Sequence, residues 1–540
     1  MTVRPMARRV APWALLAVLA LLACGERTPA SPEPTRPIVT RVVIAPSTAQ
    51  VAVGAAIVLS ASVRDQRDSV LTGESVRWSS SAGSIATVSS NGLVTGVSAG
   101  TTTIIATVAG VSATTTLTVV ASSEFQTSVP TIALNVIAAR PTASAFTLSL
   151  FSTTDRVATV TLLDDARTQT VSLAGGTARA VEWTGLTADH SYRYRVSAGD
   201  VTLEGRVRTA RASGATYRFT MQADSHLDGN SDPLIYANTL ANVVADSSDF
   251  LLDLGDTFMS DKFPEFQAAA PMYYAQRHYL GLIGASTPVF LVQGNHDAEN
   301  GWLPANATWA AAMRRQHFSA PDVGPFYAMS GTTRNYFAWT WGDATFIALD
   351  PYAFTMAKPS GSDGGWRWTL GRTQYDWLVD VLQRNRARYT FVFLHHLVGG
   401  NGAEARGGSE ASAFFEWGGR NLDGTPGFAT NRAGWPMPIH DLLVQHGVSA
   451  VFHGHDHLYV RQARDGLIYQ EVPQPSFARE NATSSAAAYG YLSGTLLGSS
   501  GHLRVTVAPE RATVEYVRSR LTTGNGVVVD RYEIAPVVRP

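Results

Sequence analysis

Five short polar segments between residues 224 and 457 each follow an apolar run with the length and composition of a buried strand. In chain order they are Asp224-Ser225-His226, Gly255-Asp256, Gly294-Asn295-His296-Asp297, His395-His396 and Gly454-His455-Asp456-His457. Amphipathic helical stretches such as Thr373–Arg386 separate the apolar runs. Strands that alternate with helices favour a layered α/β architecture, in which loops at strand carboxyl ends build the site. A single loop His or Asp is usually solvated, but five such segments predict one shared site.

These segments offer imidazole, carboxylate and amide groups but no thiolate, because the only cysteine of the chain is Cys24. Such a ligand set suits zinc, manganese or iron, whereas an oxygen-only cage would suit calcium. In Asp-x-His and His-x-His, an extended backbone would direct both side chains to one face. Two metal ions about 3.5–4 Å apart need a shared anionic bridge, which a carboxylate flanked by glycine can supply. We assign this bridge to Asp256.

In this order the motifs resemble those of the calcineurin-like metallophosphoesterase superfamily, over residues 217–472. The resemblance implies that one metal ion binds Asp224, His226 and His457, that a second binds Asn295, His395 and His455, and that Asp256 bridges them. His395 is preferred to His396, because the family ligand is followed two residues later by a Pro-like position, here Leu397. The resemblance also implies that His296 protonates the leaving group or stabilises the transition state, and that Asp297 orients its ring.

The expected charge balance supports phosphate chemistry. Two divalent ions contribute +4 and two aspartates, Asp224 and Asp256, contribute −2, which leaves about +2 at the site. Such a centre attracts a phosphate mono- or diester and lowers the pKa of bound water toward ~7. We therefore expect a metal-dependent phosphoric ester hydrolase in which metal-bound hydroxide attacks phosphorus in line, without a covalent enzyme intermediate. General acid catalysis by His296 would contribute roughly 10²–10⁴-fold.

Departures from related families narrow the class. Purple acid phosphatases place Tyr three residues after the bridging Asp, where this chain has Met259, and they lack a counterpart of His226. Protein Ser/Thr phosphatases continue Gly-Asp with Val-Asp-Arg-Gly, whereas Thr257-Phe258-Met259-Ser260 stands here. Only 83 residues follow His457, fewer than the substrate domain of the periplasmic 5′-nucleotidases would need. The expectation is a general phosphomonoesterase or phosphodiesterase, and the sequence does not choose its substrate.

The glycine-rich stretch from Gly399 to Trp435 is long for a loop and predicts a lid or a pocket wall. Within it, Trp417 and Arg420 are candidates for binding the organic group and the phosphate of the substrate, and structural packing is the alternative. His453, directly before the last motif, is expected to support the metal ligands from behind.

The first 38 residues predict export and membrane attachment. Three arginines precede the apolar run Ala11–Ala23, which is too short to span a bilayer as a mature helix. The sequence Leu21-Leu22-Ala23-Cys24 resembles the lipobox of bacterial lipoproteins, which implies removal of residues 1–23 and lipid attachment to Cys24. Residues 24–38, rich in proline, would then form a tether. A plain secretory signal with an incidental cysteine is the alternative.

Two β-rich modules precede the catalytic region. Residues 39–121 carry short strands, and the segment ATVSSNGLVTGVSAG resembles bacterial Ig-like domains of intimin and invasin type, which are spacers or adhesins. Residues 125–211 contain WTGLTADHSYRYRVSAGD, which resembles a fibronectin type III module with Leu186 and Tyr192 in its core. Residues 215–540 would form the catalytic domain, including strands within 500–535. The expected fold class is multidomain, with two β-sandwiches followed by an α/β sandwich of αββα type.

Composition agrees with globular domains and not with disorder. Hydrophobic residues make up 45% of the chain and charged residues 16%, which is typical of domains with buried cores. The formal net charge of −1 and the lack of a long basic run argue against a nucleic-acid partner. The leading hypothesis is a phosphohydrolase with two metal ions, lipid-anchored in the periplasm or at the cell surface. The rival is a surface adhesion protein with a catalytically idle domain and cell-surface contacts through its Ig-like module.

Overall fold

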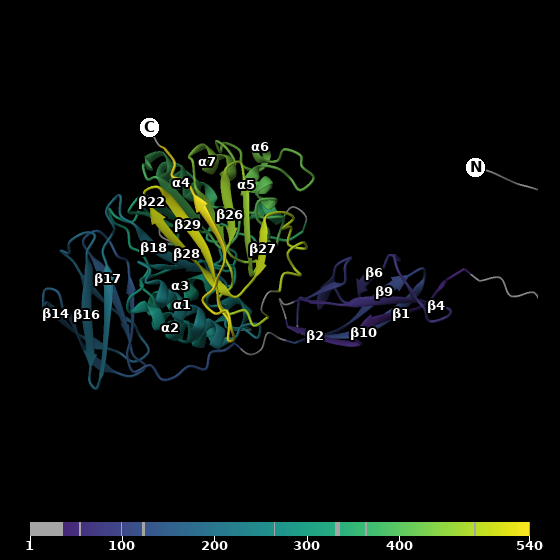
Figure 1. Cartoon of the computed structure of the whole chain (residues 1–540), viewed down its shortest axis with the longest axis horizontal. Helices are drawn as coiled ribbons and strands as arrows, with labels where there is room; N and C mark the ends of the chain where they lie inside the picture. Colours follow the sequence, from purple (N-terminus) through teal and green to yellow (C-terminus); the bar gives the residue numbers. More distant parts are fainter. Residues whose placement is uncertain are drawn as a thin grey trace, which may run out of the picture.

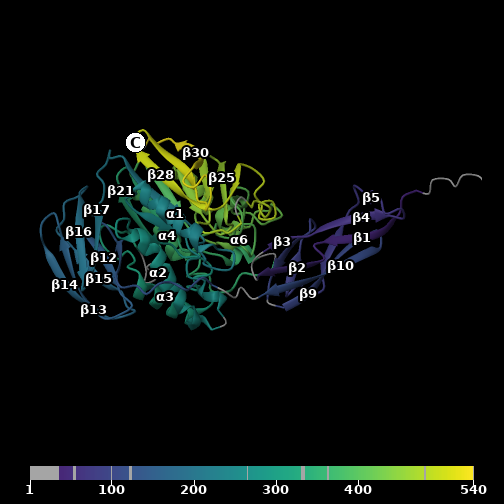
Figure 2. The same cartoon turned by 60° about the horizontal axis from the view of Figure 1, so that its bottom comes forward.

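The computed structural model describes residues 36–538 apart from 53–55, 99, 121–124, 264, 330–334, 362–363 and 480–481. The predicted signal segment, Cys24 and most of the predicted tether lie outside the described residues. The described part folds into two β-sandwiches and one α/β domain, and the α/β domain lies between the sandwiches in both Figure 1 and Figure 2. Within the described ranges, no helix combines the length and apolar character needed to cross a membrane.

The first sandwich covers the predicted Ig-like region. Its strands are β1 (Val39–Ala45), β2 (Thr48–Ala52), β3 (Ala56–Val58), β4 (Ser60–Asp65), β5 (Val70–Leu71), β6 (Arg77–Ser80), β7 (Ala86–Val88), β8 (Leu93–Gly96), β9 (Gly100–Val108) and β10 (Val111–Val120). They form the sheets β1-β4-β5, β2-β10-β9-β6 and β3-β8-β7. In β9, polar and apolar residues alternate, and this places Ile104, Ala106 and Val108 in the core.

The second sandwich has two antiparallel sheets. Its strands are β11 (Asn135–Ala139), β12 (Phe146–Phe151), β13 (Arg156–Leu162), β14 (Thr168–Leu173), β15 (Arg179–Trp183), β16 (Ser191–Ala198) and β17 (Val201–Arg208). The sheet orders are β11-β12-β15 and β14-β13-β16-β17. Phe146, Trp183 and Tyr194 are buried between the sheets. The two predicted β-sandwiches are therefore confirmed.

The α/β domain contains two larger sheets packed face to face. The first has the order β20 (Val289–Leu291), β19 (Leu251–Asp253), β18 (Tyr217–Gln222), β28 (Gly501–Ala508), β29 (Arg511–Arg518) and β30 (Val528–Ile534). The second has the order β21 (Phe337–Trp341), β22 (Ala344–Ala348), β23 (Tyr389–Phe393), β24 (Ala450–His453), β26 (Leu467–Glu471), β25 (Leu458–Arg464) and β27 (Thr495–Gly498). An aromatic core that includes Phe219, Phe250, Phe346 and Phe391 fills the space between them. The carboxy-terminal strands complete the first sheet, since β28 pairs with β18.

Helices cover the outer faces of both sheets, which confirms the predicted αββα sandwich (Figure 1). The helices are α1 (Pro233–Asp246), α2 (Ala270–Gly284), α3 (Pro304–His317), α4 (Gly371–Arg384), α5 (Phe415–Gly418), α6 (Phe428–Asn431) and α7 (Ile439–Gln445), with 3₁₀ turns η1 (Ser260–Lys262), η2 (Phe266–Ala269), η3 (Gly364–Arg367) and η4 (Ala411–Ala413). Helices α1 and α2 pack on the first sheet, and α4 and α7 on the second. Asp232 caps α1 by accepting a hydrogen bond from Leu234 N at 2.8 Å.

The second sandwich packs directly against α2. Arg277 of α2 is fully buried and donates to Asn135 Oδ1 at 2.8 Å and to Ser149 Oγ at 2.9 Å, both in the sandwich. A Cβ atom at Gly281 would lie 1.6 Å from the Asn135 amide nitrogen, so only glycine permits this close approach. The second sandwich and the α/β domain therefore form one packed unit.

Candidate metal centre

The five polar segments gather where parallel strands end. Asp224 follows β18, Asp256 follows β19, Asn295 follows β20, His395 follows β23 and His455 follows β24. Strands β18, β19 and β20 run parallel in one sheet, as do β23 and β24 in the other. Side chains from both sheets meet in two clusters of potential metal ligands, so the strand ends build one common site.

Sharp turns, and not extended backbone, aim most of these side chains. Asp224 (φ 61°), His226 (φ 42°), Asp256 (φ 54°), His455 (φ 83°) and His457 (φ 57°) all have left-handed backbone. Residues other than glycine rarely adopt this conformation, and such strain concentrates at functional sites. The prediction that an extended backbone aligns Asp-x-His and His-x-His is therefore wrong, and the two histidines of the last motif enter different ligand groups.

The first group brings together Asp224, His226 and His457, whose ligand atoms lie within 4.8 Å of one another. The Asp224 Oδ1 atom is 3.6 Å from both His226 Nε2 and His457 Nε2. Asp224 Oδ1 and His226 Nε2 are buried without a hydrogen-bond partner among the described residues. Behind this group, His226 Nδ1 faces Asp228 Oδ2 at 3.4 Å, a supporting carboxylate that the sequence analysis missed. Buried atoms of this kind, directed at one point, fit a cation.

The second group brings together Asp256, His395 and His455. His395 Nδ1 lies 3.0 Å from Leu254 O, and His455 Nε2 lies 2.8 Å from Glu404 O. Because carbonyls only accept, each ring carries its proton there and directs a lone pair into the site. These lone-pair nitrogens are 3.3 Å apart, and His395 Nε2 is 3.1 Å from Asp256 Oδ2. Acceptors this close need a positive charge between them: although burial lowers it, Asp256 and Asp224 raise the pKa of His395 to about 9, and a metal ion could take the place of that proton.

Asp256 connects the two groups. Its Oδ2 atom is 3.1 Å from His395 Nε2 and 3.7 Å from His226 Nε2. Asn295, predicted for the second ion, has a buried Oδ1 atom without a partner among the described residues. Burial alone would raise the pKa of Asp224 and Asp256, but the adjacent histidines hold both pKa values below the ordinary one. Two groups that share one ionised carboxylate suit a pair of metal ions about 3.5–4 Å apart.

His296 has a different carboxylate partner from the predicted one. Its Nδ1 atom lies 3.0 and 3.1 Å from the two oxygens of Asp261, and its Nε2 atom faces Asp256 Oδ2 at 4.0 Å. The Asp297 carboxylate accepts hydrogen bonds from the backbone N–H groups of Asp256, Thr257, Phe258 and Gly294 at 2.7–3.1 Å. The prediction that Asp297 orients the His296 ring is wrong, because this side chain folds back and fixes the backbone of the bridging residue instead.

The structure separates the two neighbouring histidines after β23. His395 enters the second ligand group, whereas His396 does not. His396 Nδ1 lies 2.9 Å from Leu397 O, and its ring packs on Tyr352 and Trp368 with centroid distances of 5.1 and 4.5 Å. Burial lowers the pKa of His396 to about 3, so this ring stays neutral in the core. The geometry therefore favours His395 as the ligand.

The two candidate substrate-binding residues differ in position. Trp417 is fully buried, and its Nε1 atom donates to Tyr469 Oη at 2.9 Å. The prediction that Trp417 contacts substrate is therefore wrong, because its indole packs in the core beneath the second sheet. Arg420 is exposed and donates to Gly424 O at 3.2 Å, and its contact with substrate stays a prediction.

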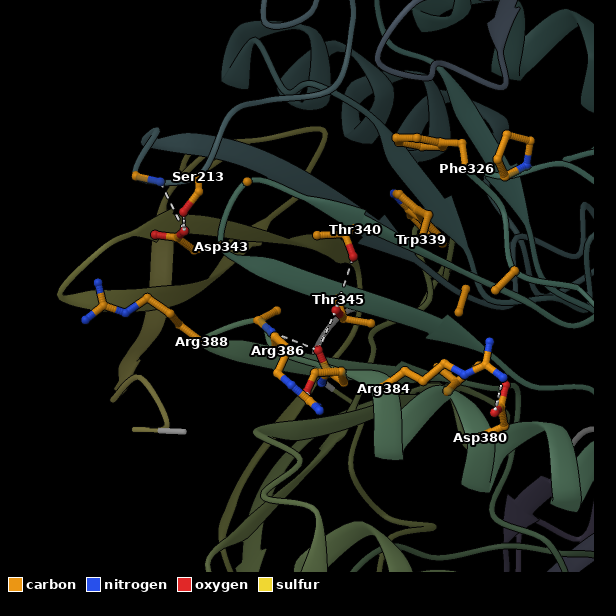
Figure 3. A pocket seen from close by; sticks show the side chains of 18 residues that line it. Ser213, Phe326, Trp339, Thr340, Asp343, Thr345, Asp380, Arg384, Arg386 and Arg388 are labelled. Atoms are coloured by element: carbon orange, nitrogen blue, oxygen red, sulfur yellow. Dashed lines mark hydrogen bonds and ion pairs between the residues drawn. The ribbon is translucent and has the colours of Figure 1, made fainter. Parts of the chain in front are cut away.

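A cavity of about 660 Å³ lies apart from the metal centre, between β21 and the end of α4 (Figure 3). Asp343 and Arg388 of its lining directly precede β22 and β23, whereas the metal ligands follow their strands. Arg384, Arg386 and Arg388 point in different directions (Figure 3), and Arg386 caps α4 by donating to Gln383 O and Asn385 O. These cations do not converge on one anion.

Comparison with known families agrees with this geometry. Residues 217–459 match the calcineurin-like phosphoesterase family, and residues 38–119 match the bacterial Ig-like domain (group 2). The α/β domain is therefore a calcineurin-like phosphoesterase domain. The chain is a metal-dependent phosphoester hydrolase with a bacterial Ig-like domain on its amino-terminal side.

Two solved structures share the fold. The structure of PhoD aligns with a TM-score of 0.52 at 15% identity and covers 74% of this chain and 88% of PhoD. The purple acid phosphatase PPD1 from yellow lupin (Lupinus luteus) seeds aligns with a TM-score of 0.50 at 12% identity and covers 92% of this chain and 95% of its own. At such identities the likeness concerns the fold alone. None of the curated proteins compared with the chain matches it.

Proposed function

We propose that the chain is an extracytoplasmic, lipid-anchored enzyme that hydrolyses phosphate mono- or diesters with two divalent transition-metal ions, namely zinc, manganese or iron. The observation that carries this proposal is the junction of two ligand groups at Asp256. Each group alone could hold one ion, but a carboxylate oxygen within 3.7 Å of ligands from both groups supports a pair.

In this proposal, the ligands divide between the two ions as the sequence motifs suggest. Asp224, His226 and His457 would hold one ion, Asn295, His395 and His455 the other, and Asp256 both. When bound, such ions neutralise phosphate charge and lower the pKa of water that attacks phosphorus. Asp297 keeps the bridging residue in place by accepting the Asp256 backbone N–H at 3.1 Å.

In this proposal, His296 delivers a proton to the leaving group. Its side chain is 21% exposed, so a substrate can reach it, and Asp261 holds its Nδ1 atom. A carboxylate at Nδ1 fixes the orientation of the ring, which leaves Nε2 free to face the departing oxygen. A positioned acid of this kind contributes roughly 10²–10⁴-fold to the rate.

The substitution His296→Ala in the full chain tests this role. We expect both metal ions to remain bound while turnover falls by roughly 10²–10⁴-fold. The matched control is His278→Ala, since the ring of this half-buried histidine of α2 packs on Tyr279. Unchanged hydrolysis by the His296 variant would reject the assigned role. A wild-type protein that binds no metal and stays inactive with added manganese or zinc would favour the adhesion alternative.

A substrate panel would choose between the two ester classes. Phosphomonoesters, phosphodiesters and nucleotides would be compared by kcat/KM with the same metal loading. A preference of at least about tenfold, or ~1.4 kcal/mol in transition-state free energy, would assign the class.

The amino-terminal part supports the proposed location. In this proposal Cys24 carries the lipid, residues 24–38 form the tether, and the Ig-like sandwich holds the enzyme away from the membrane. The second sandwich would be a fibronectin type III-like module, because that family shares a two-sheet antiparallel architecture. Cys24→Ser should abolish palmitate labelling and move the protein from the membrane to the soluble fraction. A wild-type protein that is unlabelled and soluble would contradict the anchor.

A further inference from the structure

A turn of the glycine-rich stretch folds around the last metal-ligand motif. Glu404 O accepts a hydrogen bond from His455 Nε2 at 2.8 Å. Arg406 Nη1 donates to Asp456 Oδ1 at 2.8 Å and to His455 O at 3.4 Å. The Gly407 N–H donates to Asp456 Oδ2 at 2.9 Å. The turn therefore contacts the ring and the backbone of one ligand of the second group, and also the carboxylate next to it.

A second segment holds the same carboxylate from another direction. Tyr491 Oη donates to Asp456 Oδ2 at 2.8 Å and lies 3.2 Å from Glu471 Oε2. Glu471 Oε1 accepts the Asp456 N–H at 2.9 Å, and Glu471 Oε2 lies 2.6 Å from His453 Nδ1. Asp456, Glu471 and Tyr491 are all buried. This network has few alternative arrangements, because each buried polar group in it depends on the others for its hydrogen bonds.

Left-handed residues and close packing restrict the backbone conformation of the turn. Ala405 has a left-handed backbone (φ 53°), and a Cβ atom at Gly400 would lie 2.2 Å from its carbonyl carbon. Gly407 has φ 95°, and a Cβ atom there would lie 2.9 Å from Tyr489 O. The Arg406 guanidinium also stacks over the Tyr489 ring, 4.1 Å from its centroid. The turn therefore presents its donors and its acceptor to the motif in one fixed arrangement.

The contacts of this turn stop before the first ligand group. The His457 side chain is 32% exposed, and its backbone carbonyl accepts from Ser499 Oγ at 2.8 Å. His455, in contrast, has its ring proton fixed by Glu404 O and its backbone held by Arg406. Within the described residues, the hydrogen bonds of the network therefore reach the ring and backbone of His455 in the second group, and no side chain of the first group.

We propose that Arg406 and Tyr491 are positioning residues of the second metal site, which act through Asp456 and His455 and set the affinity for the second ion. This inference rests on the proposed two-metal function. Groups behind a metal ligand fix its orientation and tautomer, and their loss typically costs 10–100-fold in metal affinity. The first ion should bind nearly as before, because within the described residues the turn forms no hydrogen bond to the side chains of its ligands, and Arg406 acts on His457 through its charge alone.

Manganese titration of the metal-free full chain tests the proposal, with calorimetry to resolve the two ions and electron paramagnetic resonance to separate mononuclear from coupled Mn²⁺. Tyr491→Phe removes one oxygen atom, and Arg406→Met removes the charge. We expect each variant to bind the first ion like the wild type and the second ion about 10–100-fold more weakly. Tyr375→Phe and Arg432→Met are matched controls. Tyr375 Oη donates to Met437 O at 2.7 Å, and Arg432 pairs with Glu416 in the same stretch, so both controls should bind both ions normally.

Several outcomes would overturn the proposal. Wild-type affinity for both ions in Tyr491→Phe and Arg406→Met would do so, as would equal loss of both ions or the same loss in the controls. Arg406→Lys keeps a cation beside Asp456 and should recover part of the affinity, and no recovery would reject the role of the charge. If Arg406→Met does not fold, Tyr491→Phe still decides. A wild type that binds fewer than two ions would instead contradict the proposed function itself.

Discussion

The two ligand groups of the metal centre differ in how they are enclosed. In the first group, the His457 side chain is 32% exposed, whereas those of His226 and Asp224 are 5% and 0% exposed. In the second group, the side chains of His395 and Asp256 are 0% and 2% exposed. In the second group, backbone carbonyl oxygens accept hydrogen bonds from the rings of His395 and His455. In the first group, the His226 ring faces the Asp228 carboxylate instead.

This difference shows how one site can serve both binding and catalysis. The partly exposed side chains are His457 of the first group and the His296–Asp261 pair beside Asp256, so substrate can approach the site from this side. The second group is built into the domain interior, where its ligands keep their positions without a substrate. Only Asp256 belongs to both environments, so changes at this residue should affect both ions.

The largest effect is expected for Asp256→Ala. Without the shared carboxylate, both ions should bind more weakly, and kcat/KM should fall on the order of 10³-fold or more, because the metal pair supplies several kcal/mol of charge stabilisation. Metal analysis and steady-state kinetics would measure this. Asp376→Asn is the control, since this exposed carboxylate of α4 pairs with Arg372 on the surface. Retention of two tightly bound ions by Asp256→Ala would refute the bridge.

The substitutions His395→Ala and His396→Ala would show which of the two histidines is a ligand of the second group. His395→Ala removes a ligand and should lower kcat/KM by about 10²-fold or more, with loss of one ion per chain. His396→Ala should keep both ions, because its ring packs on Tyr352 and Trp368 outside the ligand group. If His396→Ala loses one ion and His395→Ala keeps both, His396 is the ligand and His395 is not.

Asp261→Asn should have an intermediate effect. The amide cannot hold His296 Nδ1 with two oxygens as the carboxylate does, so kcat should fall about 10–100-fold while metal content and KM stay near the wild-type values. Asp297→Asn is a useful comparison, since it should disturb metal binding through the Asp256 backbone. If Asp261→Asn loses metal as well, Asp261 acts in ligand placement and not on His296.

The smallest effect concerns the release of the ions. Because His457 is partly exposed and the His395 and Asp256 side chains are not, a chelator should remove one ion per chain at least about tenfold faster than the other. Stopped-flow release into a metal-sensitive dye would resolve the two phases. A single phase that accounts for both ions would contradict the difference between the groups.

Much of the metal centre could be predicted from the sequence, because metal chemistry restricts ligands to a few residue types and parallel strands place them at one edge. Asp224, His226, Asp256, His395, His455 and His457 do come together. The partner of His296 could not be predicted this way. Asp297 is adjacent in sequence but folds back onto backbone N–H groups, and η1 brings Asp261 under the ring. An acidic residue soon after the Gly-Asp motif was the available signal.

The alternation of strands and helices predicted the layered fold. It could not predict contacts between modules that lie far apart in the sequence. Burial of Arg277 depends on Asn135 and Ser149, which belong to another module. Trp417 was misassigned because aromatic residues line both cores and ligand pockets, and composition cannot separate the two. The left-handed backbone at the ligands was equally hidden, since no local pattern required it.

Anomalous diffraction from crystals grown with manganese would test the central claim most directly. The account predicts two peaks per chain about 3.5–4 Å apart, with Asp256 between them, one peak beside Asp224 and the other beside His395. A single peak, or two peaks that do not share Asp256, would contradict it.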